Sequence, residues 1–308
     1  MNGVLQAGRR RFAAAVLALG ALMAVPAVQG CSPQPPAAAP LTAGLSQFRD
    51  NYGTQVIEIQ ISNARNVSVT VLSAEVSSPL FPAGTAWRAR PEGTEVPPGQ
   101  TKSLPARLPA PSCGRPGTDI PGTDNEAYAG SGAAPAEVTV SVRQGSTTSE
   151  EHLPAADPFG VLARNHSELC LAQDAGQIAD IGLAPDLEVA ADGRTAVVRL
   201  QVTPRAAGPG TLRTLIIERI EGTTLLAEAP ESPWPRGLTV AAGAGPLKLS
   251  LRIRPARCDP HAVAEDKVGT LLPVRVDAGG RKGVLKVAAG TLLKARIHEF
   301  VTAACTAH

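Results

Sequence analysis

The sequence contains few aromatic residues: five Phe, two Trp and two Tyr among 308. Surfaces that hold single-stranded nucleic acid or sugars by stacking need aromatic rings, so this shortage argues against both. Charged residues make up 18% of the chain, below the roughly 25% of an average soluble domain. The formal net charge of +2 provides no basic surface for nucleic acid. Hydrophobic residues reach 44%, so we expect a packed core.

Several sequence motifs of catalysis and cofactor binding are also missing. The chain has no G-x-S-x-G elbow, no H-E-x-x-H pair, no P-loop and no Rossmann glycine pattern. It also lacks the alternation of strands and helices that builds a parallel sheet. We therefore expect a non-catalytic protein that carries no cofactor.

The first 30 residues have the features of an export signal. Three arginines at positions 9–11 precede an apolar run over residues 12–28, which is too short and too rich in Ala and Gly for a membrane span. The segment Gly8-Arg9-Arg10-Arg11-Phe12 resembles a twin-arginine signal, while a basic start is equally typical of the general secretory route. Removing residues 1–30, which hold three Arg and no acidic residue, changes 29 basic and 27 acidic residues to 26 and 27, a net charge of −1.

The signal ends in Val28-Gln29-Gly30-Cys31, which resembles the lipobox of bacterial lipoproteins. The resemblance implies that Cys31 is acylated and becomes the new N-terminus, with the membrane as its partner. Ordinary cleavage after Ala27 is the alternative. Pro-rich chain follows Cys31, and we expect residues 31–45 to form an extended tether.

The remaining chain contains one pattern twice. Apolar and polar residues alternate over residues 56–62 and again over 197–203, as in strands with one buried face. A single tryptophan follows in each half, Trp87 and Trp234, and we expect both to anchor a core. We expect a first domain at 46–173, a linker at 174–185 and a second domain at 186–308. The longer loop of the first half, at 114–132, accommodates its extra residues.

The fold class that we predict is all-β. Short alternating strands between Pro/Gly turns favour an antiparallel sandwich in each half, with no parallel pairing. A short helix is expected at the end of each half, over residues 157–168 and 290–300, where Asp157-Pro158 is a typical helix start.

The five cysteines divide into Cys31 and two per half. Export implies an oxidising compartment, so the other four are expected to form two disulfides, for which three connectivities exist. The repeat selects Cys113–Cys170 and Cys258–Cys305, because each bridge then closes a loop within its own half. The alternative is a zinc or redox pair, although no C-x-x-C motif is present.

The lipobox-like residues 28–31 and the two sandwich-like halves together resemble tandem immunoglobulin-like lipoproteins of actinobacteria-like genomes, a mostly uncharacterised group. The resemblance implies a protein anchored at the outer face of the cytoplasmic membrane or cell surface. It would bind an envelope protein or a small ligand there, or act as a scaffold. Both cysteines lie late in each half, whereas immunoglobulin domains bridge two facing strands across a core Trp.

Two alternative functions depend on other features. Asp259, His261 and Glu265 follow Cys258 and could hold a metal ion in a secreted hydrolase, or could be a solvated polar loop. A solute-capture lipoprotein is the second alternative, but that class usually alternates helices with parallel strands. The oxygen-rich side chains of the first half's long loop suit a flexible acidic loop better than a calcium site: Asp119, Asp124, Asn125 and Glu126.

Overall fold

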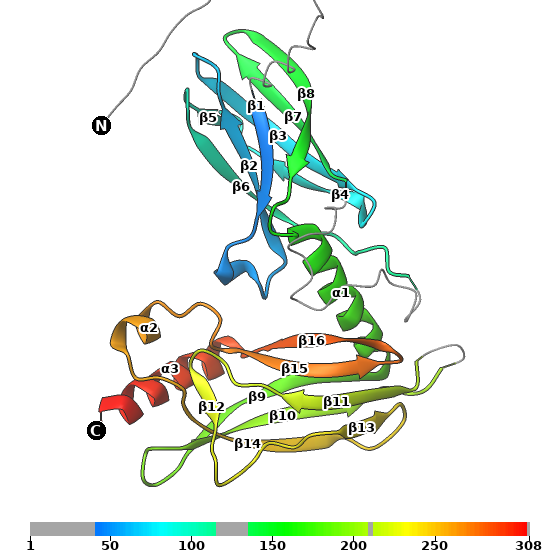
Figure 1. Ribbon diagram of the computed structural model, residues 1–308, viewed down its shortest axis with the longest axis vertical. Coiled ribbons are helices and arrows are strands. Elements are labelled where there is room, and N and C mark those ends of the chain that lie inside the picture. The colour runs from blue at the N-terminus through cyan, green and yellow to red at the C-terminus, as the bar shows by residue number, and fades with distance from the viewer. Residues whose placement is uncertain (1–40, 115–134, 209–211, 307–308) are drawn as a thin grey trace, which may run out of the picture. The chain divides into compact units, whose positions relative to one another are not determined.

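The computed structural model describes residues 41–114, 135–208 and 212–306. Within these residues the chain is mostly β-strand and forms three sheets around two hydrophobic cores (Figure 1). The predicted export signal, Cys31 and the acidic residues of the 114–132 loop lie outside the described residues.

One eight-stranded sheet surrounds the first core. Its order is β4-β3-β7-β8-β1-β2-β6, with β5 also paired to β3. The elements are β1 (Leu41–Ser46), η1 (Arg49–Asn51), β2 (Val56–Asn63), β3 (Val69–Ser78), β4 (Phe81–Arg88), β5 (Thr94–Val96), β6 (Thr101–Arg107), β7 (Glu137–Gln144), β8 (Thr147–Ala156) and the helix α1 (Val161–Ile178). Strand β8 pairs with β7 over most of its length and then passes to β1. One core therefore packs between the two layers that β8 connects.

The β1–β8 pairing corrects the expectation that every pairing is antiparallel. Ala43 and Gly44 of β1 pair in parallel with Ala155 and Ala156 of β8. This contact joins two strands that are far apart in the sequence, so no hairpin turn signals it. Its four residues are all Ala or Gly, which are weak strand formers.

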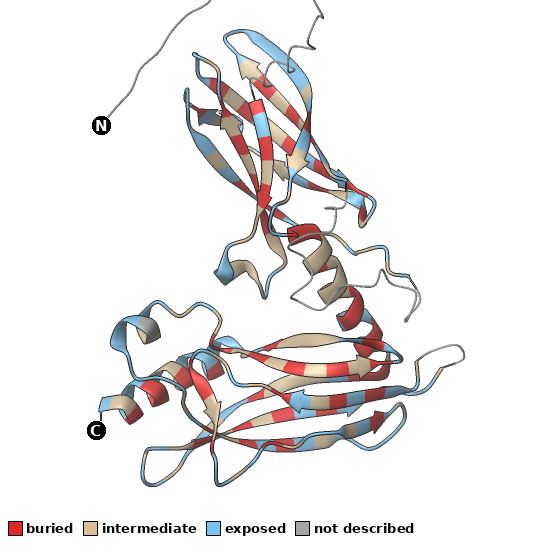
Figure 2. Cartoon of the chain, viewed as in Figure 1, coloured by how far each residue is buried: buried red, intermediate tan, exposed pale blue. Residues whose placement is uncertain are grey.

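Two four-stranded sheets surround the second core, in the orders β12-β14-β10-β9 and β13-β11-β15-β16. Their elements are β9 (Ala179–Val189), β10 (Ala196–Pro204), β11 (Thr214–Ile220), β12 (Leu226–Glu228), β13 (Leu238–Ala241), β14 (Leu247–Pro255), α2 (Pro260–Ala264), β15 (Leu271–Ala278), β16 (Arg281–Ala288) and α3 (Thr291–Thr306). The strands show alternating burial, as period-2 amphipathic segments do (Figure 2).

Among the described residues, five pairings occur in both halves in the same chain order, whereas β1–β8 and β3–β4 belong to the first half alone and β12–β14 to the second. Strand β2 pairs with β1 and β6, as β10 pairs with β9 and β14. Strand β3 pairs with β5 and β7, and β7 with β8, as β11 pairs with β13 and β15, and β15 with β16. Each series ends in a helix, α1 or α3. The internal repeat seen in the sequence therefore corresponds to a repeated set of strand pairings.

Both tryptophans pack against the cores. Trp234 is 3% exposed in the second core, and its Nε1 donates a hydrogen bond to the Arg252 carbonyl at 2.8 Å. Trp87 is partly buried against the first core.

Helix α1 begins near the expected place but is longer than expected. The backbone N–H groups of Val161 and Leu162 donate to the two carboxylate oxygens of Asp157, at 2.7 and 3.0 Å. This satisfies two of the unpaired N–H groups of the first turn. Gly160, with φ of 56°, adopts the left-handed conformation just before it.

The linker expected at residues 174–185 is wrong. Those residues form the last turn of α1 and the first part of β9, which begins at Ala179 directly after the helix. Asp174, Ala175 and Ile178 are buried. The segment contains no Pro/Gly cluster that would break the chain, and its apolar residues belong to the second core.

The tether boundary at residue 45 is also wrong, because Leu41–Ser46 forms strand β1. Leu41, Ala43 and Leu45 point into the first core and are at most 6% exposed. Their alternation with Thr42, Gly44 and Ser46 is typical of a strand. It directly follows an Ala/Pro run that is typical of an extended spacer, which led to the wrong boundary.

Replacing Leu41 by Ala should therefore destabilise the folded protein by about 2–5 kcal/mol, because it removes a buried leucine and leaves a cavity. The control Thr42→Ala, on the exposed face of β1, should change stability by less than about 0.5 kcal/mol. Urea denaturation followed by circular dichroism measures both. Equal, near-zero effects would mean that residue 41 belongs to the tether.

Candidate functional site

The structure forms the two disulfides that the repeat selects, Cys113–Cys170 and Cys258–Cys305. Each one joins the segment that follows β6 or β14 to a helix, α1 or α3. The Cα atoms are 5.5 and 5.2 Å apart, within the usual range for disulfides. The bridges thus fasten each helix to the β-strands of its own repeat.

The three candidate metal ligands after Cys258 do not form a metal site. His261 lies in the short helix α2, in place of the expected loop, and its backbone N–H donates to Oδ1 of Asp259 at 2.9 Å. The backbone N–H of Glu265 donates to the carbonyl of His261 at 2.9 Å. No group of three His, Cys, Asp or Glu side chains that could hold a metal occurs among the described residues. These residues serve local helix geometry instead.

The most distinctive polar contacts lie along α1. Its buried residues are shared between the cores: Val161 and Leu162 belong to the first, whereas Leu171, Ala175 and Ile178 belong to the second. A polar network holds the first turns. Nδ2 of Asn165, which is 2% exposed, donates to the Gln47 side chain at 3.0 Å and to the Val161 carbonyl at 2.8 Å.

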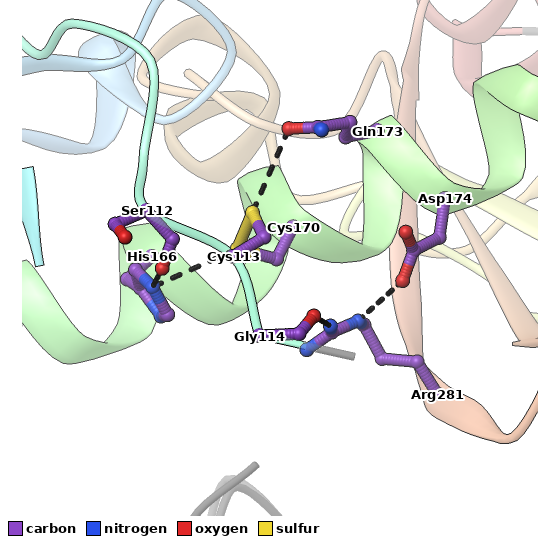
Figure 3. The surroundings of a disulfide bond; sticks show 8 residues. All are labelled: Ser112, Cys113, Gly114, His166, Cys170, Gln173, Asp174 and Arg281. Atoms are coloured by element: carbon purple, nitrogen blue, oxygen red, sulfur yellow. Dashed lines mark hydrogen bonds and ion pairs between the residues drawn. A yellow bond between two sulfur atoms is a disulfide. The ribbon is translucent and has the colours of Figure 1, made fainter. Parts of the chain in front are cut away.

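A buried ion pair holds the last turns of α1 against β16. Nε of Arg281 donates to Oδ2 of Asp174 at 2.6 Å, and both side chains are only 7% exposed. Nη2 of Arg281 also donates to the carbonyl oxygen of Gly114 at 2.8 Å, so one guanidinium connects β16, α1 and the segment beside Cys113 (Figure 3). Burial raises the pKa of Asp174 and lowers the pKa of Arg281. Both shifts mean that desolvation disfavours the charged forms, and the contact between the two side chains offsets only part of that cost.

A second ion pair also joins α1 to β16. Nζ of Lys286 is 2.6 Å from Oε1 of Glu168, and both side chains are 26% exposed. The Lys286 amine also lies 4.9 Å from the ring centre of Tyr52, and the guanidinium carbon of Arg164 lies 5.2 Å from the same ring. Both distances suit a cation–π contact.

These side chains border a groove of about 360 Å³ along α1. Strand β9 and strand β16 form its sides, and each is the last strand of its sheet. The groove offers the Lys286 amine, the Glu168 carboxylate and the Tyr52 ring beside Leu169 and Ala172. Its volume is within the range of small-ligand sites, and the two charged groups on its border pair with each other.

None of these residues is among those predicted from the sequence, although one signal for them is present. Cys170, Asp174 and Ile178 follow each other at intervals of four, so they lie on one face of a helix. An aspartate within such a buried stripe requires a partner. The sequence does not show that the partner is Arg281, which is 107 residues away.

Glu58 in β2 is a second buried carboxylate, and the alternation of apolar and polar residues in β2 does not predict its burial. The pattern places it on an outward face, yet it is only 3% exposed. Nδ2 of Asn51 in η1 donates to its Oε1 at 3.2 Å. Burial raises the pKa of Glu58, the nearby Asp50 charge raises it further, and the Asn51 hydrogen bond lowers it.

Comparison with known proteins gives little guidance. No known family matches the sequence, and no curated protein matches it. Among solved structures, red sea bream transglutaminase is 12% identical and has a TM-score of 0.22, with 83% of this chain and 32% of that one covered. An exo-β-D-glucosaminidase, CsxA, is 11% identical with a TM-score of 0.20, and Amycolatopsis orientalis exo-chitosanase CsxA is 12% identical with a TM-score of 0.20. Each of these two covers 80% of this chain and 26% of its own.

This chain therefore spans only a quarter to a third of the length of those structures. Similarity at these scores supports no argument about activity. In the described part of the chain, no helix is both long and apolar enough to cross a membrane.

Asp174→Asn should destabilise the protein by about 3–5 kcal/mol, because it leaves the Arg281 charge buried without its counter-ion. The double variant Asp174→Leu with Arg281→Met should recover most of that loss, since it removes both buried charges. Arg296→Gln breaks the exposed Arg296–Asp186 pair and should cost less than about 1 kcal/mol. Urea denaturation of these three variants and of the unchanged protein measures the free energies of unfolding to be compared. A double variant as unstable as Asp174→Asn would contradict a paired role.

Glu58→Gln should remove a pH dependence of stability. A carboxyl whose pKa is raised in the folded state binds its proton more tightly there than in the unfolded chain, so folding stability falls as pH rises from the ordinary glutamate pKa of 4.5 through the folded pKa. The stability of Glu58→Gln relative to the unchanged protein should therefore increase between pH 4 and pH 7. Urea denaturation across this range, with Glu95→Gln on the exposed face of β5 as control, tests it. A difference that shrinks or stays constant with pH would be inconsistent with a raised pKa.

Proposed function

We propose that this protein is a lipid-anchored extracytoplasmic protein that binds a ligand or envelope partner through two tandem immunoglobulin-like sandwich domains. The observation that carries the proposal is the repeated set of strand pairings, each ending in a helix that a disulfide fastens. Such stapled β-modules are typical of proteins that work outside the cytoplasm.

Two independent features support the proposed location. Two disulfides are consistent with an oxidising compartment, and the basic and apolar start of the chain is typical of export. Acylation at Cys31 would then anchor the protein at the outer face of the membrane, with the chain after it as spacer.

A binding role is favoured over a catalytic one. The Asp259, His261 and Glu265 side chains on which a metal-dependent hydrolase would depend are not gathered into a metal site. The groove along α1 instead combines an amine, a carboxylate and an aromatic ring. Such a lining suits recognition of a polar ligand and is our candidate for the binding surface.

Cys31→Ala should move the protein from the membrane fraction to the soluble fraction of the exported material, because the lipid can no longer be attached. Ser32→Ala, at the next residue, is the matched control and should stay with the membrane. Fractionation with immunoblotting measures the distribution, and mass spectrometry of the N-terminal peptide detects the lipid. A Cys31→Ala protein that fractionates like Ser32→Ala would refute the anchor.

A further inference from the structure

We propose that the Cys113–Cys170 disulfide is a reducible latch on α1, opened by a dithiol reductant. Cys113–Cys170 is the more buried of the two bridges, since Cys258 is exposed and Cys305 is half-buried, so what distinguishes it is the group beside its buried sulfur. Cys170 is 0% exposed, whereas Cys113 is only half-buried. A thiolate from outside therefore reaches the sulfur of Cys113, and Cys170 is the leaving sulfur.

His166 provides a donor beside that leaving sulfur. Its Nε2 is 2.8 Å from the carbonyl oxygen of Ser112, and a carbonyl can only accept, so Nε2 carries the proton (Figure 3). The same nitrogen is 3.6 Å from Sγ of Cys170. In the closed bridge this N–H is donated to the Ser112 carbonyl, and a thiolate that develops on Cys170 competes for the same proton. Such a donor stabilises the thiolate, and a thiol of lower pKa leaves faster. His166 is thus a positioning and stabilising residue for the Cys170 thiolate.

In the Cys258–Cys305 bridge, the contact that the structure gives for a sulfur is with a carbonyl oxygen and not with an N–H group. Sγ of Cys305 is 3.6 Å from the carbonyl oxygen of Arg257. A carbonyl oxygen faces a thiolate with its own negative partial charge and does not stabilise it. We therefore expect the two disulfides to be reduced at different rates.

A dithiol reductant supplies both electrons for opening the bridge. One of its thiolates attacks Sγ of Cys113 and forms a mixed disulfide, while the Cys113–Cys170 bond breaks and its electron pair stays on Cys170, which then takes a proton. The second thiol of the reductant then attacks the reductant's other sulfur, the one bonded to Cys113 in the mixed disulfide. This closes the reductant's disulfide and releases Cys113. The protein gains two electrons and two protons, and the dithiol becomes a disulfide.

Opening this bridge changes the anchoring of α1. Gly114, next to Cys113, accepts a hydrogen bond from Arg281, which pairs with Asp174 on the last turns of the helix. Without the covalent bond, residues 112–114 are held by hydrogen bonds: the Ser112 N–H donates to the Leu80 carbonyl, and the carbonyls of Ser112 and Gly114 contact His166 and Arg281. Since Leu171, Ala175 and Ile178 of α1 belong to the second core, release in the first repeat should loosen the second.

The test is a time course of the whole exported chain with dithiothreitol at pH 7, quenched by alkylation and mapped by peptide mass spectrometry. We expect Cys113 and Cys170 to be alkylated about tenfold faster than Cys258 and Cys305, the order of magnitude of one charge-assisted hydrogen bond. His166→Ala should bring the two rates together, whereas His298→Ala, in α3 but seven residues before Cys305, should leave the difference unchanged. Equal rates, faster opening of Cys258–Cys305, or no effect of His166→Ala would overturn the proposal.

Hydrogen exchange then tests the latch separately from the chemistry. After selective opening and alkylation of Cys113 and Cys170, amides of α1 between Leu171 and Ile178 should exchange faster, while those of α3 stay protected. If His166→Ala does not fold, His166→Gln retains a neutral N–H donor and should give an intermediate rate difference. Unchanged protection of α1 in the opened protein would show that the bridge is not a latch.

Discussion

The constraint on which the described structure depends is that one helix, α1, belongs to two cores. Its first turn packs Val161 and Leu162 into the first core, and its last two turns pack Leu171, Ala175 and Ile178 into the second. No residue separates the helix from β9, which starts at Ala179. A helix that is buried at both ends cannot move without exposing apolar surface, and such exposure is costly. The disulfide at Cys170 and the ion pair at Asp174 therefore add to the restraint that packing places on this segment.

The buried Asp174–Arg281 pair is an expensive way to dock a helix, since an apolar pair of the same volume is often as stable or more so. Its benefit lies in specificity. A guanidinium that must satisfy both the Asp174 carboxylate and the Gly114 carbonyl fixes the helix in one register against β16. Leucine and alanine side chains alone would tolerate a shift of one turn. The exposed pairs on β9 and α3 do not impose such a requirement, because water can replace either partner.

The parts of the fold that the sequence predicted are those with a local signal. Alternation over residues 56–62 and 197–203 predicted β2 and β10, and the presence of two cysteines at matching places in each repeat predicted both disulfides. The missed parts depend on contacts between distant residues. Strand β1 is buried only because β2 and β8 lie on either side of it. Glu58 is buried only because η1 carries Asn51 over it. For the same reason Arg281 could not be recognised as the partner of Asp174.

The repeat also explains why the two helices have different roles despite similar positions. Helix α3 packs on β9 and β14 of its own repeat, and all its buried residues belong to the second core. Helix α1 packs chiefly on β16, which is an edge strand of a sheet in the following repeat. An edge strand has unpaired backbone groups that proteins usually cover, and α1 covers the edge of β16. The groove bordered by Tyr52, Glu168 and Lys286 lies where this cover meets β9. A binding surface at that place therefore results from using a repeat-terminal helix as a connection between repeats, and whatever loosens α1 also changes the groove.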